Sequence, residues 1–404
     1  MDLKAPPLAL YLHFPWCVRK CPYCDFNSHT LHGAVPHAAY IEALLHDLDA
    51  QLADAALADV AGRSVVSVFL GGGTPSLFPP AALGRLFEGL RRRLNFEPQA
   101  EITLEANPGT IERGRFEDYR AAGINRVSLG AQSFDEQMLV RLGRIHAAAD
   151  TRRAAAELHA AGLVNFNLDL MYALPGQDLA GALADLRAAI ELEPAHLSHY
   201  QLTMEPGTVF GSRPPAGLPD DELSLQMQQR CQAELARAGY VHYEVSAYAR
   251  AGARCSHNLN YWEFGDYLGL GAGAHGKLTR ADAGRIVRTV REREPRRYLA
   301  RGHAAAPGLT VVPAADLPFE FMMNALRLVE GFALTRFEAH TGLGRESVAP
   351  KLRALAARGL IEVAGERCRP TVLGLRFLND VMADFLPPAT GDRARGKSPV
   401  GPVV

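Results

Sequence analysis

The sequence has few cysteines, no long hydrophobic run and almost no net charge. Its 404 residues include 6 cysteines and carry a formal net charge of −1. Six cysteines in a chain of this length cannot form a disulfide framework, so we expect a reducing compartment. A near-neutral chain has no global attraction for nucleic acid. No stretch approaches the roughly 18 apolar residues that a membrane-spanning helix needs.

The first residues, MDLKAPPLALYLHF, lack the basic start, apolar core and cleavage site of a secretory signal. We therefore expect a cytoplasmic protein without a transmembrane segment. The chain is 48% hydrophobic and 22% charged, which is ordinary for a globular protein. Its length suits one large domain and one small domain.

Six short strands are predicted, with helix-like segments between them. They cover residues 8–15, 64–73, 101–108, 126–133, 166–176 and 196–206. Strands that alternate with helices form parallel βαβ units, which places this chain in the α/β class. Periodicity alone fits both an incomplete barrel and an open doubly wound sheet. Unusual polar residues follow several strands, at the edge where both architectures build their sites.

Changes in composition and hydrophobic pattern divide the chain into three parts. We assign residues 1–300 to the large domain and expect an irregular extension after about residue 210. Residues 310–384 read as helix, helix, short β-hairpin and helix, so we predict a small winged-helix-like domain there. Residues 385–404 have too little apolar content to form a core, and we expect a disordered tail.

Three of the six cysteines lie in the stretch CVRKCPYCDF, at Cys17, Cys21 and Cys24. One loop can bring their thiolates together. A zinc site completed by His13 or His29, or a redox pair, is the plain alternative, but the chain has no second CxxC of the kind that closes a structural zinc site. An iron–sulfur cluster normally takes four cysteines, so three would leave one iron open to a small molecule.

CxxxCxxC after a strand, with Tyr23 before the last cysteine, resembles the signature of the radical S-adenosylmethionine superfamily. The resemblance implies a partial (β/α)6 barrel and a [4Fe-4S] cluster on Cys17, Cys21 and Cys24. It also implies S-adenosylmethionine on the open iron, cleaved by an electron to methionine and a 5′-deoxyadenosyl radical. GGGTP at 71–75 resembles the family's site for the amino group of this cofactor, since glycine lets backbone approach a ligand closely.

The order of the motifs resembles the oxygen-independent coproporphyrinogen III oxidase family over most of the chain. The resemblance implies a first cofactor molecule at Tyr11, Gly72 and Glu105. A second molecule would be bound by residues that also follow or end strands, namely Tyr23, Gly73, Thr74, Gln132, Arg144 and Asp169. Whether one or two molecules bind is left open.

One position departs from the oxidases of this family. They carry a fourth cysteine where this chain has Phe26. WCVRKCPYCDFNSH and HNLNYW (257–262) are instead similar to the family's heme-chaperone branch. That branch implies heme as bound cargo, its transfer to client hemoproteins, and no oxidation of coproporphyrinogen. Respiratory-chain proteins are candidate clients, a role compatible with peripheral membrane contact.

His257 opens the HNLNYW motif and is the candidate heme ligand. Histidine is a common axial ligand of heme iron, and the adjacent Tyr261 and Trp262 can flank a porphyrin. Cys255 is a rival ligand two residues earlier. The heme can also bind elsewhere.

Two other functions remain open from the sequence. The shared cofactor residues fit an oxygen-independent coproporphyrinogen III oxidase, and the scaffold fits a radical enzyme that acts on an unrelated substrate. No catalytic residue and no oligomeric state is assigned.

Two further motifs are set aside. GAGAHG (271–276) matches GxGxxG but lacks the context of a dinucleotide site, so we expect a tight loop beside the cofactor site. The C-terminal domain carries basic residues interspersed with acids, a pattern typical of a solvated face and not of nucleic-acid binding. They are Lys351, Arg353, Arg358, Arg367 and Arg369. We expect this domain to act as a lid or to dock clients.

Overall fold

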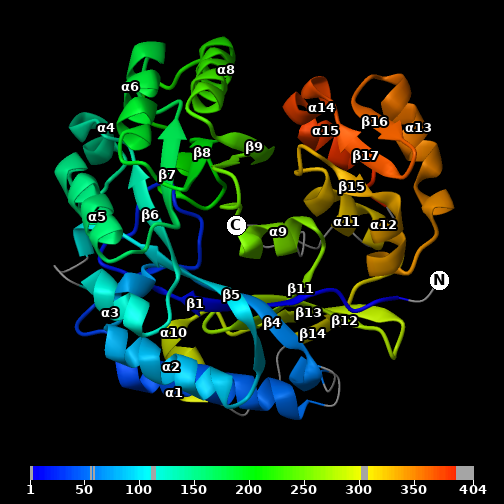
Figure 1. The fold of residues 1–404 in the computed structure, drawn as a ribbon, viewed down its shortest axis with the longest axis horizontal. Helices are drawn as coiled ribbons and strands as arrows, with labels where there is room; N and C mark the ends of the chain where they lie inside the picture. The colour runs from blue at the N-terminus through cyan, green and yellow to red at the C-terminus, as the bar shows by residue number, and fades with distance from the viewer. Residues whose placement is uncertain (1–2, 55–56, 58–59, 111–114, 302–307, 388–404) are drawn as a thin grey trace.

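A single twelve-stranded sheet forms the larger part of the molecule (Figure 1). The computed structural model describes residues 3–54, 57, 60–110, 115–301 and 308–387. Six strands at the centre of the sheet run parallel and keep the order of the chain. They are β1 (Leu8–Phe14), β4 (Ser64–Gly72), β5 (Asn95–Ala106), β6 (Arg126–Gln132), β7 (Phe166–Tyr172) and β8 (His196–Gln201). These are the six predicted strands, and the predicted partial (β/α)6 barrel is confirmed.

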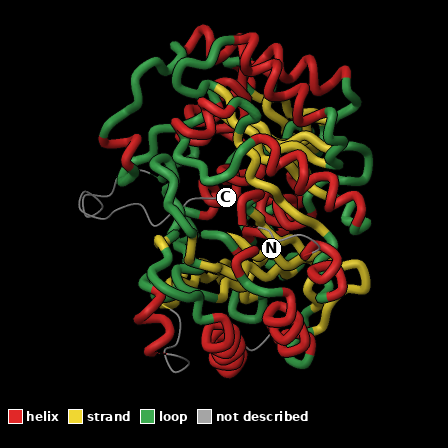
Figure 2. The backbone as a smooth tube through the Cα atoms, turned by 90° about the vertical axis from the view of Figure 1, so that its left-hand side faces the viewer, coloured by secondary structure: helices red, strands yellow, loops and turns green. Residues whose placement is uncertain are grey.

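Helices cover the outer face of the curved sheet (Figures 1 and 2). They are α1 (His37–Ala53), α2 (Pro80–Arg91), α3 (Arg115–Ala121), α4 (Glu136–Arg141), α5 (Ala148–Ala160), α6 (Leu179–Ile190), α8 (Asp221–Arg237) and α10 (Pro295–Arg301). In α2, Leu83, Leu86, Phe87 and Leu90 recur every three or four residues and are buried, which is the pattern of a helix packed on a sheet. No helix in the described part of the chain is long and apolar enough to cross a membrane.

The stretch from 210 to 300 is more regular than we expected. Besides α8 and the short helix α7 (Val209–Ser212), it extends the sheet at both edges. The extension strands are β9 (Val241–Glu244), β10 (Ala247–Ala249), β11 (Asp266–Leu270), β12 (His275–Arg280) and β13 (Arg285–Val290), followed by β14 (Gly308–Val311). β11 pairs in parallel with β1, on the side opposite β4. This part of the extension therefore lies beside β1, the strand that carries the predicted cofactor residue Tyr11.

One helix of this stretch, α9 (Ser256–Trp262), lies on the inner side of the sheet (Figure 1). It carries the HNLNYW motif and packs against β4, β1 and β11. The open side of the incomplete barrel is therefore occupied in part by this helix.

A second hydrophobic core forms the C-terminal lobe. The lobe contains α11 (Leu317–Ala325), β15 (Phe332–Ala333), α12 (Leu334–Thr341), α13 (Ala349–Ala357), β16 (Ile361–Ala364), β17 (Arg367–Pro370), α14 (Val372–Arg376) and α15 (Leu378–Ala383). β16 and β17 form the expected hairpin, whereas α12 was not expected from the sequence. Of the expected tail, Phe385 is buried in this core, and residues 388–404 lie outside the described residues.

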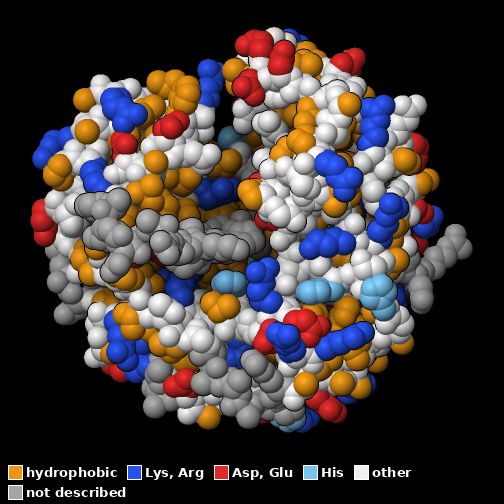
Figure 3. Space-filling model, turned by 180° about the vertical axis from the view of Figure 1, so that it is seen from behind, with side chains coloured by type: hydrophobic (Ala, Val, Ile, Leu, Met, Phe, Trp, Pro, Cys, Tyr) orange, Lys and Arg blue, Asp and Glu red, His pale blue; other side chains and the backbone are white. Residues whose placement is uncertain are grey.

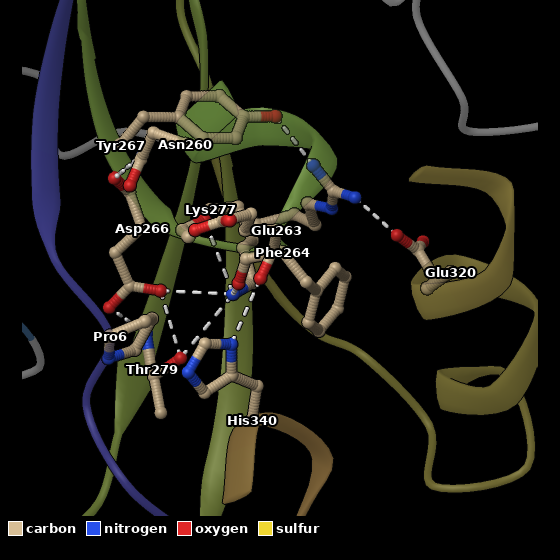
Figure 4. Close-up of polar contacts among 12 residues, drawn as sticks. Pro6, Asn260, Glu263, Phe264, Asp266, Tyr267, Lys277, Thr279, Glu320 and His340 are labelled. Atoms are coloured by element: carbon tan, nitrogen blue, oxygen red, sulfur yellow. Dashed lines mark hydrogen bonds and ion pairs between the residues drawn. The ribbon is translucent and has the colours of Figure 1, made fainter. Parts of the chain in front are cut away.

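Polar contacts join the C-terminal lobe to the sheet extension, and others lie within the extension itself (Figure 4). His340 of α12 donates from Nδ1 to the carbonyl oxygen of Glu263 at 3.0 Å. Lys277 of β12 donates to the carbonyl of Phe264 at 2.8 Å and pairs with Asp266 at 3.0 Å. Figure 3 shows a hollow between the C-terminal lobe and the lobe of α6 and α8, with hydrophobic and basic side chains visible in it.

Candidate functional site

The three cysteines lie on one loop at the carboxyl end of β1. The base of the loop is closed by β2 (Trp16–Cys17), which pairs in parallel with β3 (His29–Thr30). Within the loop the N–H of Cys24 donates to the carbonyl of Cys21 at 3.2 Å. All three thiols are free and partly exposed. The loop therefore presents three free thiols at the edge of the sheet where α/β proteins build their sites.

Each thiol has a polar neighbour. Thr74 Oγ1 lies 3.5 Å from Cys17 Sγ, Arg144 Nη1 lies 3.7 Å from Cys21 Sγ, and Ser28 Oγ lies 3.7 Å from Cys24 Sγ. Burial raises the pKa of Cys17 and of Cys24, while the neighbouring hydroxyl groups act in the opposite direction. Donors of this kind stabilise a metal-bound thiolate by hydrogen bonding to its sulfur.

The zinc alternative fits this loop poorly. His13 accepts from the Tyr11 hydroxyl at Nδ1 and donates from Nε2 to the carbonyl of Asn27, both at 2.9 Å. His29 Nε2 donates to the Asn27 side-chain oxygen at 3.3 Å. Among the described residues, no group of three or more His, Cys, Asp or Glu side chains is arranged to hold one metal ion. In a cubane cluster each cysteine binds its own iron, so separated thiols suit a cluster better than a single ion.

The glycine run packs against the base of the cysteine loop. Gly73 donates its N–H to the carbonyl of Phe14 at 2.7 Å, and a Cβ on Gly73 would lie 2.6 Å from the carbonyl oxygen of Trp16. Gly72 has a φ of +107° and donates its N–H to Glu105 Oε2 at 3.1 Å. Side chains at these two positions would push the cysteine loop away or strain the backbone. The run therefore brings backbone close to the cysteine loop.

Two carboxylates face the interior of the barrel. Burial raises the pKa of Glu105 to about 8, and the negative charge of Asp169 adds to the effect. Burial also raises the pKa of Asp169, which accepts from Asn167 Nδ2 at 2.7 Å and from Ser128 Oγ at 3.2 Å. A ligand that donates hydrogen bonds or carries positive charge would stabilise the ionised form of such a buried carboxyl group.

Tyr200 on β8 links the second group of predicted cofactor residues. Its hydroxyl donates to Gln132 Oε1 at 2.9 Å. Burial raises the pKa of Tyr200, and the charges of Asp169, Tyr23, Arg144 and Glu105 also act on it. Five of the predicted cofactor residues therefore lie around one tyrosine: Tyr23, Glu105, Gln132, Arg144 and Asp169. Tyr200 was not among the predicted site residues, although it lies within the predicted strand 196–206; the observed strand β8 ends one residue after it, at Gln201.

Arg144 spans the cysteine loop and the barrel edge. Its Nη2 donates to the carbonyl of Gly130 at 2.7 Å, and Nη1 contacts Cys21. Its Nε is buried and has no hydrogen-bond partner among the residues that the structure describes. A guanidinium with a spare buried donor is suited to an anionic group, such as a ligand carboxylate or a cluster sulfide.

His257 is buried in the barrel interior, with 1% of its surface exposed. Its Nδ1 is hydrogen-bonded to Ser67 Oγ at 3.0 Å and its Nε2 to the Tyr261 hydroxyl at 3.1 Å. The ring stacks on Phe69, which also stacks on Tyr11. Burial lowers the pKa of His257 to about 3. Both ring nitrogens are thus engaged, so a heme iron can bind this histidine only if one of these two hydrogen bonds is broken.

Cys255, the rival heme ligand, is also enclosed. Burial raises the pKa of this thiol to about 12, and its Sγ lies 3.4 Å from Glu101 Oε1. The same carboxylate accepts the N–H groups of Ser256 and His257, each at 3.1 Å. Glu101 therefore caps the first turn of α9, a role that the sequence analysis did not anticipate.

The two motifs set aside in the sequence have structural roles. GAGAHG connects β11 to the antiparallel β12 and is followed by no helix, which excludes the dinucleotide-binding arrangement. Several of the basic side chains of the C-terminal lobe have partners nearby: Arg358 pairs with Asp384, Arg369 with Glu362, and Arg367 with the carbonyl of Glu330. Paired charges of this kind form a solvated face.

Comparison with known proteins places the chain in a family. The model of the radical SAM superfamily matches residues 11–188, and that of the HemN C-terminal domain matches residues 312–377. The curated "Heme chaperone HemW" of Escherichia coli K12 is 51% identical, over 95% of this chain and 99% of that protein. The chain belongs to the HemW family. The HemW of Haemophilus influenzae is 48% identical and that of Mycobacterium tuberculosis 34%, each over 95% of this chain.

A solved structure shares the fold of this HemW family member. The coproporphyrinogen III oxidase HemN of E. coli, described as a radical SAM enzyme, superposes with a TM-score of 0.77. It is 24% identical, and the match covers 94% of this chain and 90% of that one. The likeness confirms the architecture of barrel and C-terminal lobe, and its low identity carries nothing about activity.

Proposed function

We propose that this protein is a heme chaperone that holds a [4Fe-4S] cluster and S-adenosylmethionine and passes bound heme to client hemoproteins. The observation that carries the proposal is the cysteine loop: three free thiols stand beside the glycine run, with Phe26 in place of the oxidases' fourth cysteine. The 51% identity, over 95% of this chain, with a protein named heme chaperone supports it. A cytoplasmic location stays a prediction of the sequence.

The residues present fit the cluster. Cys17, Cys21 and Cys24 would hold three irons, and the donors of Thr74, Ser28 and Arg144 would stabilise the sulfurs. A cluster bound there supplies a low-potential electron and one open iron site. Lys20 donates to the carbonyls of Phe26 and Ser28 at 3.0 and 3.1 Å and so braces the loop across its open side.

The residues around Tyr200 fit S-adenosylmethionine. Backbone of the glycine run would meet its amino acid part, and Glu105 would accept hydrogen bonds from its hydroxyl or ammonium groups. Arg144, with an unpartnered Nε, would meet a carboxylate. Gln132, Asp169, Tyr11 and Tyr23 would complete the polar and aromatic lining.

The function is tested by titrating heme into anaerobically reconstituted protein and following its absorption. Saturable, stoichiometric binding is expected, and an apo-hemoprotein added afterwards should gain the heme spectrum. Coproporphyrinogen III is assayed under the same conditions, with an active oxidase as control. Turnover without stable heme binding would contradict the chaperone and support the oxidase. Cofactor cleavage stimulated by a non-porphyrin compound would support an unrelated radical enzyme.

A further inference from the structure

Asn27 stands three residues after Cys24 and ties the cysteine loop to distant parts of the chain. Its side-chain amide donates to the carbonyls of Ala272 and Arg293, each at 2.9 Å. Its side-chain oxygen accepts from His29, and its main-chain oxygen accepts from His13. One residue thus joins the cysteine loop, the end of β1 and the extension of the sheet.

The loop that receives Asn27 is shaped for it. Gly273 has a φ of +84°, and a Cβ there would overlap the Asn27 amide nitrogen. Gly271 has a φ of +105°, and a Cβ there would overlap the carbonyl oxygen of His13. The glycines of GAGAHG therefore allow residues 271–276, called here the glycine loop, to lie directly against the cysteine loop.

The glycine loop is itself held firmly from behind. Tyr40 donates to the carbonyl of His13 at 2.6 Å and accepts the N–H of Ala272 at 3.0 Å. Asp47, which is 2% exposed, accepts from the N–H of Gly271 at 3.2 Å, from Arg291 Nε at 3.0 Å and from the Tyr298 hydroxyl at 2.7 Å. The glycine loop is therefore a rigid acceptor, and it cannot shift to keep its hydrogen bond if Asn27 moves.

We infer that Asn27 is a positioning residue for the iron–sulfur cluster and that the glycine loop is the platform that holds it. The inference rests on the cluster binding proposed above. Residues outside the ligands orient metal sites, and their loss commonly weakens metal affinity about 10- to 100-fold. The glycine loop continues β11, which follows α9 after three residues. The same contact therefore connects the cysteine loop to the helix that carries His257.

The test compares four variants after anaerobic reconstitution. Asn27→Ala removes all side-chain bonds, and Asn27→Asp keeps the shape but loses both donated bonds. Gly273→Ala displaces the Asn27 amide from the opposite side. Gly252→Ala is the matched control, because Gly252 has a φ of +76° and a Cβ there meets no described atom within 4 Å. It reproduces the backbone strain without the contact.

Three properties are measured: iron release to a chelator, the electron paramagnetic resonance spectrum of the reduced cluster, and the midpoint potential of the cluster. The temperature is one at which every apo variant keeps the circular dichroism spectrum of the folded protein. We expect about 10- to 100-fold faster release, with an altered spectrum and potential, in both Asn27 variants and in Gly273→Ala. Gly252→Ala should match the wild type. If Asn27→Ala does not fold, the isosteric Asn27→Asp decides.

The outcomes separate this inference from the proposed function. A wild type that takes up no cluster contradicts the proposed function. A stable wild-type cluster with unchanged release, spectrum and potential in Asn27→Asp and Gly273→Ala overturns only the role of Asn27. Equal loss in Gly252→Ala would also overturn it, because strain alone would then explain the effect.

Discussion

Glu101 Oε1 accepts the backbone N–H of His257 at 3.1 Å. The carboxylate lies in the middle of β5, and the histidine lies in the first turn of α9. Arg126 stands 3.9 Å from the same carboxylate and is 2% exposed. The helix that carries the candidate heme ligand is thus anchored to the sheet through one buried charge pair.

Glu101→Gln should destabilise the protein. The substitution keeps an acceptor for α9 but removes the carboxylate charge that lies 3.9 Å from the buried guanidinium of Arg126. Losing that charge costs about 3 kcal/mol of unfolding free energy. Urea unfolding of the apo protein measures the change. Glu117→Gln, at an exposed position of α3, is the control and should change stability by no more than about 0.5 kcal/mol. Equal stability of the two variants would show that Glu101 is not an anchor.

Replacing any of Cys17, Cys21 and Cys24 by alanine should remove the cluster. The reconstituted wild type should absorb near about 400 nm, where iron–sulfur charge transfer is expected, and each variant should lose that band and its iron. Cys231→Ala serves as the control, because Cys231 is buried in α8, far along the chain from the loop. A normal iron content in all three loop variants would refute the cluster assignment.

His257→Ala should weaken heme binding by about tenfold or more while the cluster stays intact, if His257 is the iron ligand. A second variant, at Tyr261, tests the same ring nitrogen directly. Tyr261→Phe removes the hydroxyl that occupies Nε2 of His257, so it should strengthen heme binding by freeing that nitrogen. Heme titrations of both variants beside the wild type decide. Unchanged affinity in both would place the heme elsewhere.

Glu105 should make S-adenosylmethionine binding depend on pH. Burial holds the pKa of this carboxyl at about 8 in the free protein, whereas a bound hydroxyl or ammonium group favours the ionised form. Affinity should therefore rise with pH, by at most about tenfold per unit, and level off above about pH 8. Equilibrium binding to cluster-loaded protein between about pH 6.5 and 8.5 measures this. Glu105→Gln should bind more weakly and show no such slope; a slope that persists would point to another group.

His199 should contribute to acid sensitivity. Burial lowers its pKa to about 4, so the folded state binds the proton only at a lower pH than the unfolded state does. Stability from the neutral ring is fully present above about pH 6.5 and is lost as the pH falls towards 4, by about 3 kcal/mol in total. His199→Phe, which keeps an aromatic ring against Tyr172, should unfold with a smaller pH dependence in urea. Identical pH dependence of the two proteins would contradict this.

Local pattern in the sequence was enough to predict the central sheet and the cysteine loop. Six strands alternate with helices, and three cysteines within eight positions need only one loop to meet. Glu101, Thr103 and Glu105 also share one face of β5 by the alternation of a strand, so an interior place for Glu101 was within reach. Helix α12 was missed because two of its four buried positions, Glu338 and Thr341, are polar, so its apolar pattern is incomplete.

Contacts between distant segments were decided only by the tertiary structure. Asn27 and Ala272 are 245 positions apart, and nothing local in either segment indicates that they meet. The burial of His257, with Ser67 and Tyr261 on its two nitrogens, likewise follows from how α9 packs inside the sheet. The sequence by itself determined the family, because its motifs can be recognised in order along the chain, and it indicated the three cysteines as candidate cluster ligands, because they lie near one another. Packing decided which side chains are enclosed and which face a ligand, because burial depends on segments that only folding brings together.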